Sequence, residues 1–252
     1  MKLFGDYHTH TIYSHGKGKI EDNVRVAEEK GLKEVAITDH GFSHKLYSVL
    51  RKEIPIMRRQ IEDLRSRYNV NILLGVEANL ISMNGDIDVL QDDEEQLDII
   101  LMGFHKRIYA HSLKDRFKFF IMNTLSKIFG VSNKRLQINT DSYLKALEKN
   151  NIDVITHLGY GMPVDAVQVA RACKEHNTYL ELNGKRILFK EDEMQKIIDT
   201  GVKFIINSDA HSTGKIGECP LGIKYALKYN IPLEQIANIN KLPTFKKHKN
   251  TI

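Results

Sequence analysis

The 252-residue sequence has no tryptophan, only two cysteines and five prolines, and no long apolar run. Cys173 and Cys219 cannot cross-link a chain of this length into a disulfide framework, so we expect reduced thiols and a cytoplasmic protein. No segment approaches the roughly 18 apolar residues that a membrane-spanning helix needs. The N-terminal segment also lacks the apolar stretch of a secretion signal. We therefore expect neither a disulfide-stapled secreted domain nor a membrane protein.

The balance of residue types is that of a folded domain. Hydrophobic residues make up 42% and charged residues 27% of the chain, which is enough apolar material for a core. This composition argues against collagen-like, low-complexity and largely disordered chains. The length suits one α/β barrel and no linker or internal repeat is visible, so residues 1–252 are expected to form a single domain.

Positive charge is concentrated in two segments. The net charge is +5, but residues 106–135 alone carry +7, and residues 241–252 add four lysines and no acid. The remainder of the chain is therefore net acidic. We interpret both segments as solvated surface. The alternative is that they attract an anionic substrate or an oligonucleotide backbone.

Short β-rich runs alternate with helical patterns along the chain. Most of these runs are continuously apolar, as is typical of strands that are buried on both faces. The alternation predicts one parallel sheet, most simply a barrel of about seven strands. The predicted strands are residues 2–7, 34–38, 71–76, 98–102, 153–156, 178–182 and 202–207.

Apolar spacing marks the helices between these strands. Ile20, Val24 and Ala27 share one face of the first helix, and Gly31 is a plausible end for it. The inward residues predicted for two later helices are Ile56, Met57, Ile61, Leu64 and Tyr68 in one, and Val167, Ala170 and Cys173 in the other.

Residues 106–135 interrupt this alternation with a basic helical insertion. Between residues 114 and 129, apolar side chains recur at helical spacing among the basic residues Lys114, Arg116, Lys118 and Lys127. We expect the apolar stripe to pack on its own domain. A basic amphipathic helix can also lie on a membrane surface. The stripe consists of Phe117, Phe120, Ile121, Leu125, Ile128 and Phe129.

The placement of the 11 histidines is the most informative feature of the sequence. Most of them follow a predicted strand, as do two of the acidic residues. Because the C-terminal ends of parallel strands share one rim of a barrel, these side chains are expected to meet there. In chain order the candidates are His8, His10, His15, His40, Glu77, His105, His157, Asp209 and His211.

Imidazole and carboxylate groups are ligands of Zn, Mn and Fe. Nine such groups exceed the needs of one ion, and they suit two or three divalent ions that share a bridging carboxylate. Glu77 is the natural bridge, because one carboxylate can bind two cations. The remaining histidines do not follow the pattern and are predicted not to be ligands: His44, His111, His176 and His248.

The motifs DYHTHTIYSHG, ITDH, GVEAN, GFH, THLG and NSDAH resemble, in this order, those of the PHP (polymerase and histidinol phosphatase) family. The resemblance covers about residues 1–240. It implies a distorted seven-stranded (β/α)7 TIM-like barrel with a trinuclear metal centre at its C-terminal rim. Each of the nine ligand positions of the family has a matching residue type here. No polymerase sequence is attached, so the chain resembles a stand-alone phosphoesterase.

Such a centre suggests how a phosphate ester would be cleaved. Clustered divalent ions reduce the repulsion between hydroxide and the anionic ester, and they lower the pKa of bound water toward about 7. We expect a metal-bridging hydroxide, held through Glu77, His40, Asp209 and His211, to attack phosphorus in line.

The residues around the ligands have weaker assignments. Asp6 and Asp39 could each accept the free imidazole N–H of a ligand, or Asp39 could cap the next turn. Cations beside the metal rim could hold a second phosphate or the far end of the ester, with Arg107 or Arg186 favoured for bidentate contact. The predicted substrate contacts are Lys17, Arg107, Asn183 and Arg186, with Lys19, Lys106 and Lys185 nearby.

Three functions remain open from the sequence. The first is a phosphatase acting on a small phosphomonoester such as histidinol phosphate or a nucleotide. The second is a nuclease or phosphodiesterase acting on DNA ends or oligonucleotides, which the basic insertion and tail would favour. The third is a metal-bound scaffold without activity, against which the full ligand set argues.

Overall fold

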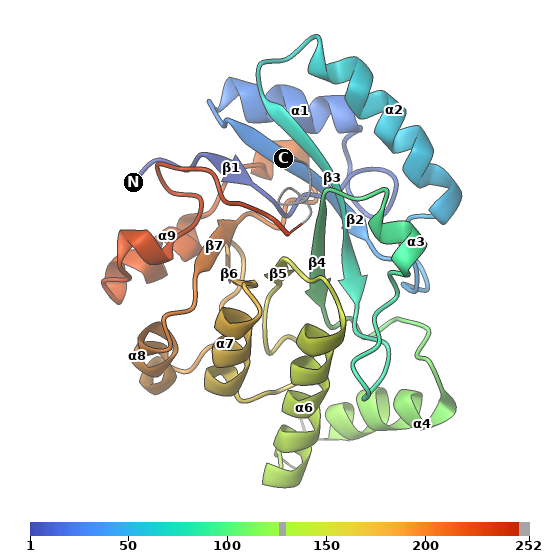
Figure 1. Cartoon of the computed structure of the whole chain (residues 1–252), viewed down its shortest axis with the longest axis vertical. Coiled ribbons are helices and arrows are strands. Elements are labelled where there is room, and N and C mark those ends of the chain that lie inside the picture. The colour runs from blue at the N-terminus through green and yellow to red at the C-terminus, as the bar shows by residue number, and fades with distance from the viewer. Residues whose placement is uncertain (126–129, 247–252) are drawn as a thin grey trace.

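The structure is a computed structural model that describes residues 1–125 and 130–246, with the backbone alone at Lys118, Phe120 and Met122. Seven parallel strands follow one another in chain order around a nearly closed barrel, and helices cover its outside (Figure 1). The predicted α/β barrel is therefore confirmed. The strands are β1 (Gly5–Asp6), β2 (Glu34–His40), β3 (Asn71–Asn79), β4 (Ile99–Gly103), β5 (Val154–Ile155), β6 (Tyr179–Asn183) and β7 (Phe204–Asn207).

Each predicted strand is present, with changed bounds. β1 is shorter than predicted, because Leu3 forms an antiparallel bridge with Ile239 instead of joining the parallel sheet. β2 and β3 continue beyond their apolar runs as far as His40 and Asn79. The apolar pattern ended these two strands too early, because it stops where their polar side chains begin.

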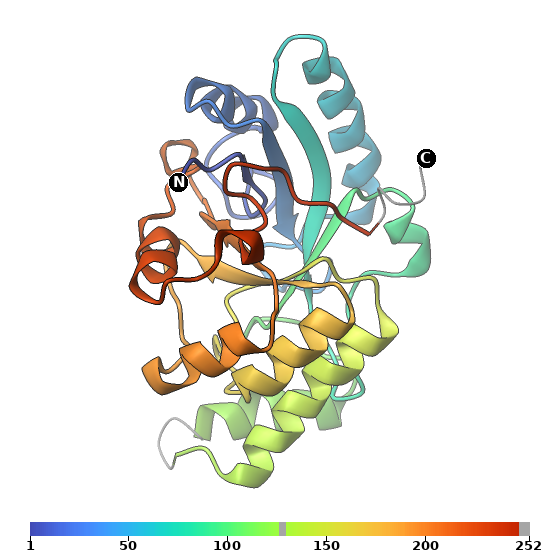
Figure 2. The ribbon, with the colours of Figure 1, turned by 60° about the vertical axis from the view of Figure 1, so that its left-hand side comes forward.

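Helices flank the barrel in two groups. α1 and α2 lie side by side over one part of the sheet, and α6, α7 and α8 form a layer over another part (Figure 2). Among the described residues, no helix combines the length and apolar character that crossing a lipid bilayer requires. The α-helices are α1 (Ile20–Glu29), α2 (Ile54–Arg65), α3 (Gln91–Glu94), α4 (Leu113–Arg116), α6 (Asn133–Lys149), α7 (Ala166–Glu175), α8 (Glu191–Asp199) and α9 (Pro220–Lys228). The other helical segments are the 3-10 helices η1 (Arg51–Glu53), η3 (Thr213–Lys215) and η4 (Leu233–Gln235), and the π-helix η2 (Phe117–Met122).

The predicted inward faces of these helices are largely correct. The three residues predicted for α1 are buried, and Gly31 follows the helix with a φ of +71°, a conformation that glycine adopts at little cost. In α7, Val167 is only partly buried. The α2 face needs a correction: Ile54 faces the core, whereas Ile56 is 40% exposed, because the helix begins at Ile54 and turns Ile56 outward.

Side chains along each strand alternate between the barrel interior and the layer beneath the helices. In β3, Ile72, Leu74 and Val76 pack under the helices, while Leu73 and Glu77 face the interior. The inward residues are apolar toward the strand beginnings and polar toward the strand ends. The apolar layer includes Ala36, Leu73, Ile99, Leu101, Val154, Tyr179 and Ile205. This apolar layer lies beneath the polar rim, and we call it the floor of the barrel.

The C-terminal segment covers the other side of this floor. The ring of Phe245 is 1% exposed, and its centroid lies 5.0 Å from that of Tyr7 and 6.0 Å from that of Tyr179. The backbone N–H of Lys246 donates to the Asp153 carboxylate at 2.8 Å. The predicted basic tail, residues 241–252, is therefore not surface alone, because Phe245 packs into the barrel, whereas Lys241, Leu242 and Thr244 are exposed. Residues 247–252, including His248, lie outside the described residues.

Ala210 closes the barrel between its first and last strands. Its N–H donates to the backbone oxygen of His8 at 3.1 Å, and its carbonyl accepts from the N–H of His10 at 2.8 Å. This seam aligns the DYHTH and NSDAH segments in parallel. It brings His8 and His10 beside Asp209 and His211, although about 200 residues separate the two segments.

The insertion of residues 106–135 follows β4 and lies beyond the ends of β3 and β4 (Figure 1). Its predicted apolar stripe is wrong: Phe117, Ile121 and Leu125 are 51%, 48% and 40% exposed, whereas Phe119 and Asn123 are buried. The segment packs through other side chains instead: the ring of Phe119 meets that of Phe104 edge-on at a centroid distance of 5.6 Å, and Asn123 accepts from Asn139 at 2.8 Å. Outside the described parts lie Lys127, Ile128 and Phe129, and the side chains of Lys118 and Phe120.

Candidate metal centre

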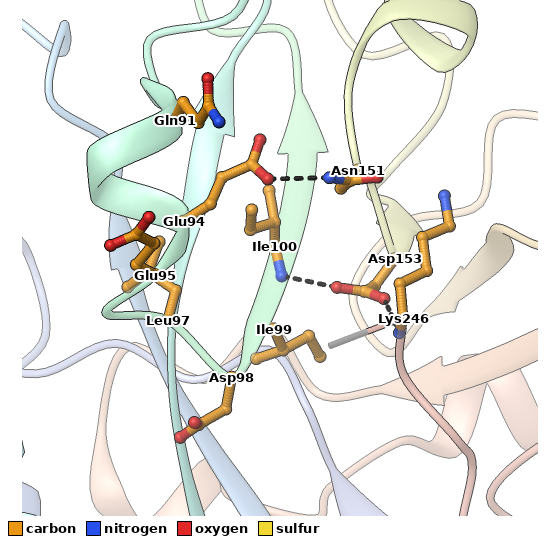
Figure 3. A pocket seen from close by; sticks show the side chains of 10 residues that line it. All are labelled: Gln91, Glu94, Glu95, Leu97, Asp98, Ile99, Ile100, Asn151, Asp153 and Lys246. Carbon is orange, nitrogen blue, oxygen red and sulfur yellow. Dashed lines mark hydrogen bonds between the residues drawn. The ribbon is translucent and has the colours of Figure 1, made fainter. Parts of the chain in front are cut away.

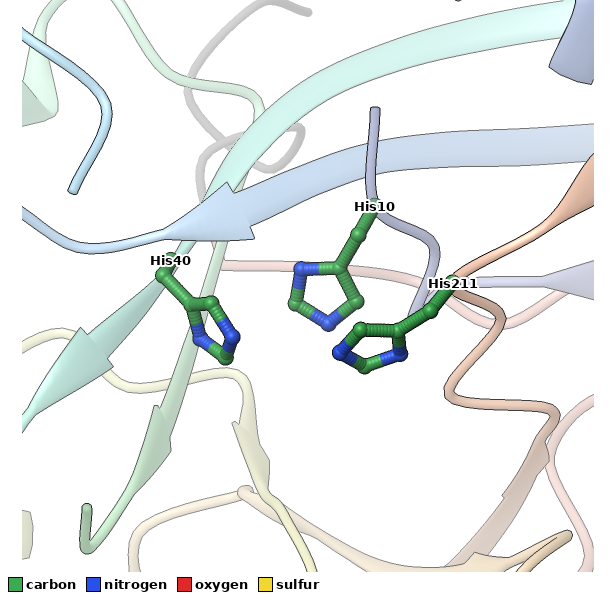
Figure 4. A group of neighbouring side chains, drawn as sticks. All are labelled: His10, His40 and His211. Carbon is green, nitrogen blue, oxygen red and sulfur yellow. The ribbon is translucent and has the colours of Figure 1, made fainter. Parts of the chain in front are cut away.

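The nine predicted ligands lie together at the C-terminal rim of the barrel. The ring centroid of His10 is 4.4 Å from that of His40 and 4.2 Å from that of His211, and the three rings point toward one another (Figure 4). His15 joins them from the loop after β1, 4.6 Å from His211. In three groups, the donor atoms all lie within 4.8 Å of one another: His10, His40 and His211; His8, His10 and Asp209; and His40, Glu77 and His105.

Glu77 lies between two sets of imidazoles. Its Oε1 is 2.7 Å from Nε2 of His157 and 3.3 Å from Nε2 of His8. Its Oε2 is 3.0 Å from Nδ1 of His40 and 3.4 Å from Nε2 of His105. Burial raises the pKa of Glu77, but the surrounding histidines outweigh it and hold this pKa well below its usual value. The side chain is therefore an ionised carboxylate with one oxygen toward each set.

Asp209 is the second carboxylate of the cluster. Its Oδ1 lies 3.2 Å from Nδ1 of His211 and 3.8–3.9 Å from the Nε2 atoms of His10 and His8. The Nζ of Lys185 is 3.1 Å from the same oxygen. Asp209 has a φ of +54°, a left-handed conformation that aspartate tolerates better than most residues. This backbone turn aims the carboxylate into the cluster.

Several buried polar atoms of the cluster have no hydrogen-bond partner among the described residues. These atoms are Nε2 of His8, both ring nitrogens of His10, Nδ1 of His40, Oε2 of Glu77 and Nδ1 of His157. Each such atom costs about 1–3 kcal/mol when it stays unpaired. Bound cations would satisfy these atoms, and a donor set of imidazoles and carboxylates fits Zn, Mn or Fe. The residues present therefore fit a metal centre.

Burial and neighbouring charge divide the histidines into two classes. Burial lowers the pKa of His10 well below its usual value and that of His40 to about 3, so both rings are neutral. Burial also lowers the pKa of His8 and His157, but nearby carboxylates, Glu77 first, outweigh it and raise both pKa values. The cluster thus contains ligands that are ready to bind and ligands that must first lose a proton.

Glu181 is a central residue that sequence reasoning missed. Its Oε1 lies 2.8 Å from Nδ1 of His8, and its Oε2 accepts the backbone N–H of His157 at 2.8 Å. Asn183 and Asn207 donate to the same carboxylate. The only available signal was its position two residues before Asn183, which puts both side chains on the inward face of β6.

Asn79 orients His105 in a similar way. Its Oδ1 lies 2.8 Å from Nδ1 of His105, and its own amide donates to Asp88 at 2.6 Å. The Nε2 of His105 is thereby directed toward Glu77. Sequence reasoning missed this pair, because the strand was predicted to end before Asn79.

The predicted roles of Asp6 and Asp39 need correction. The Asp6 carboxylate accepts the backbone N–H groups of Ser208 and Gly217, so it ties the two ends of the barrel seam together. Asp39 accepts the N–H and the hydroxyl of Thr11 at 2.7 Å and 2.6 Å. Both acids hold backbone that carries ligands, and no contact to an imidazole ring is found for either among the described residues.

His44, which was predicted not to be a ligand, lines the same pocket as the ligands. Its ring stacks on that of His40 at a centroid distance of 5.0 Å. Its Nδ1 accepts the backbone N–H of Tyr47 at 3.1 Å, so this nitrogen faces away from the cluster. Burial lowers the pKa of His44 to about 4. Of the other predicted non-ligands, His111 is exposed and His176 lies at the C-terminal end of α7.

Two of the predicted substrate contacts line the pocket above the cluster, and two do not. Arg107 and Arg186 belong to the lining of this pocket of about 340 Å³. Lys17 is exposed and does not line it. Asn183 is buried and uses its side chain internally, donating to Glu181 and accepting two backbone N–H groups. Asn183 therefore positions Glu181 and the backbone of Lys185 and Arg186.

A second pocket, of about 260 Å³, lies near the beginnings of β4 and β5 (Figure 3). Its acids have partners within the protein: Glu94 accepts from Asn151 at 2.8 Å, and Asp153 accepts from the N–H of Ile100 at 2.9 Å. Asp98 pairs with Arg58. These interactions support the floor of the barrel and leave the metal-ligand cluster as the candidate site.

The sequence and the fold are similar to those of known proteins. The sequence matches the family model of the PHP domain over residues 6–208. A probable phosphatase of Shewanella sediminis is 30% identical over 253 residues, covering 94% of this chain and 90% of that protein. A probable phosphatase of Aliivibrio fischeri is 29% identical over 252 residues, covering 94% and 89%.

The fold also resembles a solved structure, that of histidinol phosphate phosphatase from Lactococcus lactis in complex with zinc, L-histidinol and phosphate. The TM-score is 0.56 and the identity 15%, over 96% of this chain and 97% of that chain. At this identity the likeness shows the fold alone.

Proposed function

Because this chain belongs to the PHP domain family, we propose that it is a metal-dependent phosphatase that hydrolyses a small phosphomonoester. The observation that carries the proposal is the position of Glu77, an ionised carboxylate with one oxygen toward His8 and His157 and the other toward His40 and His105. A carboxylate between two sets of ligands is suited to bridge two cations. Residues 1–252 would act as one PHP domain, and the two buried, unpaired cysteines fit the reducing cytoplasm.

Two or three divalent ions, Zn, Mn or Fe, would be held by the nine residues of the cluster. Seven of them belong to the three groups whose donor atoms lie within 4.8 Å of one another, while His15 lies beside His211 and His157 beside Glu77. Several of the buried donor atoms have no protein partner among the described residues. The complete proposed set is His8, His10, His15, His40, Glu77, His105, His157, Asp209 and His211. Three overlapping groups of donors support a trinuclear centre.

When bound, divalent ions supply the positive charge that screens the phosphate ester and makes hydroxide available near neutral pH. The protein's own residues orient the reaction. Glu181 and Asn79 fix the rings of His8 and His105, and the apolar floor keeps water from the far side of the cluster. Arg107 and Arg186 line the open side, where the rest of the ester would lie. No covalent side-chain nucleophile is required.

The proposal also specifies the class of substrate, a small phosphorylated molecule. The solved relative holds L-histidinol and phosphate, and a pocket of about 340 Å³ suits a small phosphorylated molecule of that order. The alternative is a phosphodiesterase acting on oligonucleotides, for which the exposed basic residues Lys114 and Arg116 of α4 are the supporting observation.

Phosphate release by the metal-reconstituted protein tests the proposal. The panel contains histidinol phosphate, nucleoside monophosphates, other small phosphomonoesters, and 5′- and 3′-labelled oligonucleotides. We expect release from at least one small monoester, little change with salt, and loss of turnover after treatment with a chelator. Shortened oligonucleotides with a steep salt dependence would favour the alternative. No release from any compound, with metal bound, would contradict both.

Two variants connect that activity to the cluster. His8→Ala and Asp209→Ala should each abolish turnover while circular dichroism and thermal unfolding show a retained fold. Wild-type activity in either variant would contradict the shared metal centre.

A further inference from the structure

The pocket above the metal-ligand cluster has its acids at the base and its cations toward the opening. Its two carboxylates, Glu77 and Asp209, lie among the histidines. Three cations line the rest: Lys106 and Arg107, which follow β4, and Arg186, which follows β6. A ligand that extends from the cluster toward the opening therefore contacts the metal ligands at one end and these three cations at the other.

Two of these cations make cation–π contacts with the ring of Tyr160, which lies in the loop after β5. The guanidinium carbon of Arg186 lies 4.4 Å from the ring centroid, and Nζ of Lys106 lies 5.9 Å from it. An aromatic face attracts a cation but does not neutralise it. The positive charge of Arg186 therefore remains available to a bound anion.

The two arginines lack an acidic partner in the described part of the chain. No described carboxylate lies within 4.0 Å of either Arg107 or Arg186. By contrast, Lys185, next to Arg186, pairs with Asp209 at 3.1 Å. An arginine without a carboxylate keeps its planar fork of donors available for a carboxylate or phosphate ligand.

We propose that the substrate is a phosphomonoester whose far end carries a second anionic group, either a carboxylate or a phosphate, that binds Arg107 and Arg186 beside Lys106. The inference rests on the proposed function, because the first phosphate is the one that the metal centre would hold. An ester whose far end is an ammonium group meets three cations in this pocket, and the only acids among the described lining residues are the two at its base. Substrates of that kind, histidinol phosphate among them, are therefore disfavoured.

A series of alkyl phosphates of equal chain length tests this inference. The four compounds end in a methyl, an ammonium, a carboxylate or a second phosphate group. With metal-loaded protein, kcat/KM should be about 10- to 100-fold higher for the two anionic ends than for the methyl end, as expected for charge-assisted hydrogen bonds. The ammonium compound should be the poorest substrate. Comparison of the compounds that end in a carboxylate and in a second phosphate shows which of these two anionic groups the site prefers.

Variants then assign the effect to the arginines. Arg186→Ala and Arg107→Ala should each lower the ratio of kcat/KM between the anionic and the methyl compounds. Arg171→Ala, on the exposed side of α7, is the matched control and should leave both the ratio and the activity unchanged. A ratio that stays unchanged in both pocket variants would overturn the assignment.

Binding of the corresponding phosphonates, measured by calorimetry, separates this inference from the proposed function. Equal affinity for all four ends, or preference for the ammonium end, overturns the second-anion site whether or not phosphate is released. Preferential binding of the anionic ends by a protein that releases no phosphate supports the site and contradicts the proposed phosphatase activity alone.

Discussion

Nδ1 of His8 lies 2.8 Å from Oε1 of Glu181, and both side chains are buried. His8 belongs to the segment after β1 and Glu181 to β6, and around the barrel only β7 lies between them. With Nδ1 engaged, Nε2 of His8 points to Glu77 and Asp209, where it has no hydrogen-bond partner among the described residues. Glu181 therefore fixes which nitrogen of His8 is offered to a metal.

Replacement of this carboxylate should weaken metal binding without removing a ligand. We expect Glu181→Gln to lower the affinity for Zn by about 10- to 100-fold, as is usual when the partner of a ligand imidazole is lost. Metal competition with a chromophoric chelator measures the effect. Glu175→Gln, at the exposed end of α7, is the control and should bind as the wild type does.

Glu181 also accepts N–H groups from His157, Asn183 and Asn207, so the variant could lose stability as well. Thermal unfolding of the metal-free protein separates the two effects. Unchanged Zn affinity in a folded Glu181→Gln protein would contradict the orienting role.

Metal binding should release protons near neutral pH. The raised pKa values of His8 and His157 mean that these rings hold a proton in the metal-free protein at a pH where free imidazole has lost it. The lowered pKa of His10, and that of His40 at about 3, mean that these rings release none. About one to two protons should therefore leave on Zn binding at pH 7, and the affinity should increase as pH rises.

Calorimetry in buffers of different ionisation enthalpy counts these protons. In His157→Ala the number released should fall by up to about one. A wild-type protein that binds Zn with no proton release, and with affinity independent of pH between 6 and 8, would contradict the assignment of charged His8 and His157.

Because Gly103 has no side chain, it leaves room for the contact between Glu77 and His157. A Cβ atom at this position would lie 2.5 Å from Oγ1 of Thr156, 2.7 Å from Cε1 of His157 and 3.2 Å from Oε1 of Glu77. Gly103→Ala should therefore displace His157 and reduce the amount of metal bound, at a cost of about 1–3 kcal/mol in the free energy of unfolding.

Metal content after dialysis against Zn, together with thermal unfolding, measures both effects. Gly214→Ala is the control, because a Cβ atom there meets nothing within 4 Å. Full metal content in Gly103→Ala would show that the cluster tolerates a shift of His157.

The sequence predicted the strands and the candidate ligands because both depend on local order. An apolar run followed by His, Asp or Glu specifies a buried strand with a polar end, and the parallel barrel then brings those ends together. What surrounds the ligands depends on distant neighbours. Glu181 meets His8 only because closure of the barrel at Ala210 brings the segment after β1 next to β7 and close to β6, across a sequence separation of 173 residues.

Two features depend on tertiary contacts that residue spacing does not encode. His44 follows no strand, and an antiparallel bridge between His44 and Ile108 returns its loop to the rim, where it lines the pocket. In the insertion, Phe117, Ile121 and Leu125 recur every four residues as predicted, but Phe119 and Asn123 are the side chains that the domain buries. Residue spacing reveals neither a loop bridge nor which face of a helix packs on its domain.

The floor of the barrel should control stability independently of the metal centre. Phe245 is 1% exposed and packs between Tyr7 and Tyr179, at the end of the barrel away from the ligands. Phe245→Ala leaves a cavity in this apolar layer, so we expect the free energy of unfolding to fall by about 3–5 kcal/mol. Denaturant unfolding of the metal-free protein measures the loss. Leu227→Ala, at a side chain that is 62% exposed, is the control and should change stability little.

The metal affinity of folded Phe245→Ala protein should match that of the wild type, because the apolar layer separates the ring from Glu77 and the histidines. If the variant instead loses metal affinity as steeply as Glu181→Gln, the floor and the rim are coupled, and packing beneath the cluster contributes to the positions of its ligands. If stability stays within about 0.5 kcal/mol of the wild type, the C-terminal segment is not part of the core.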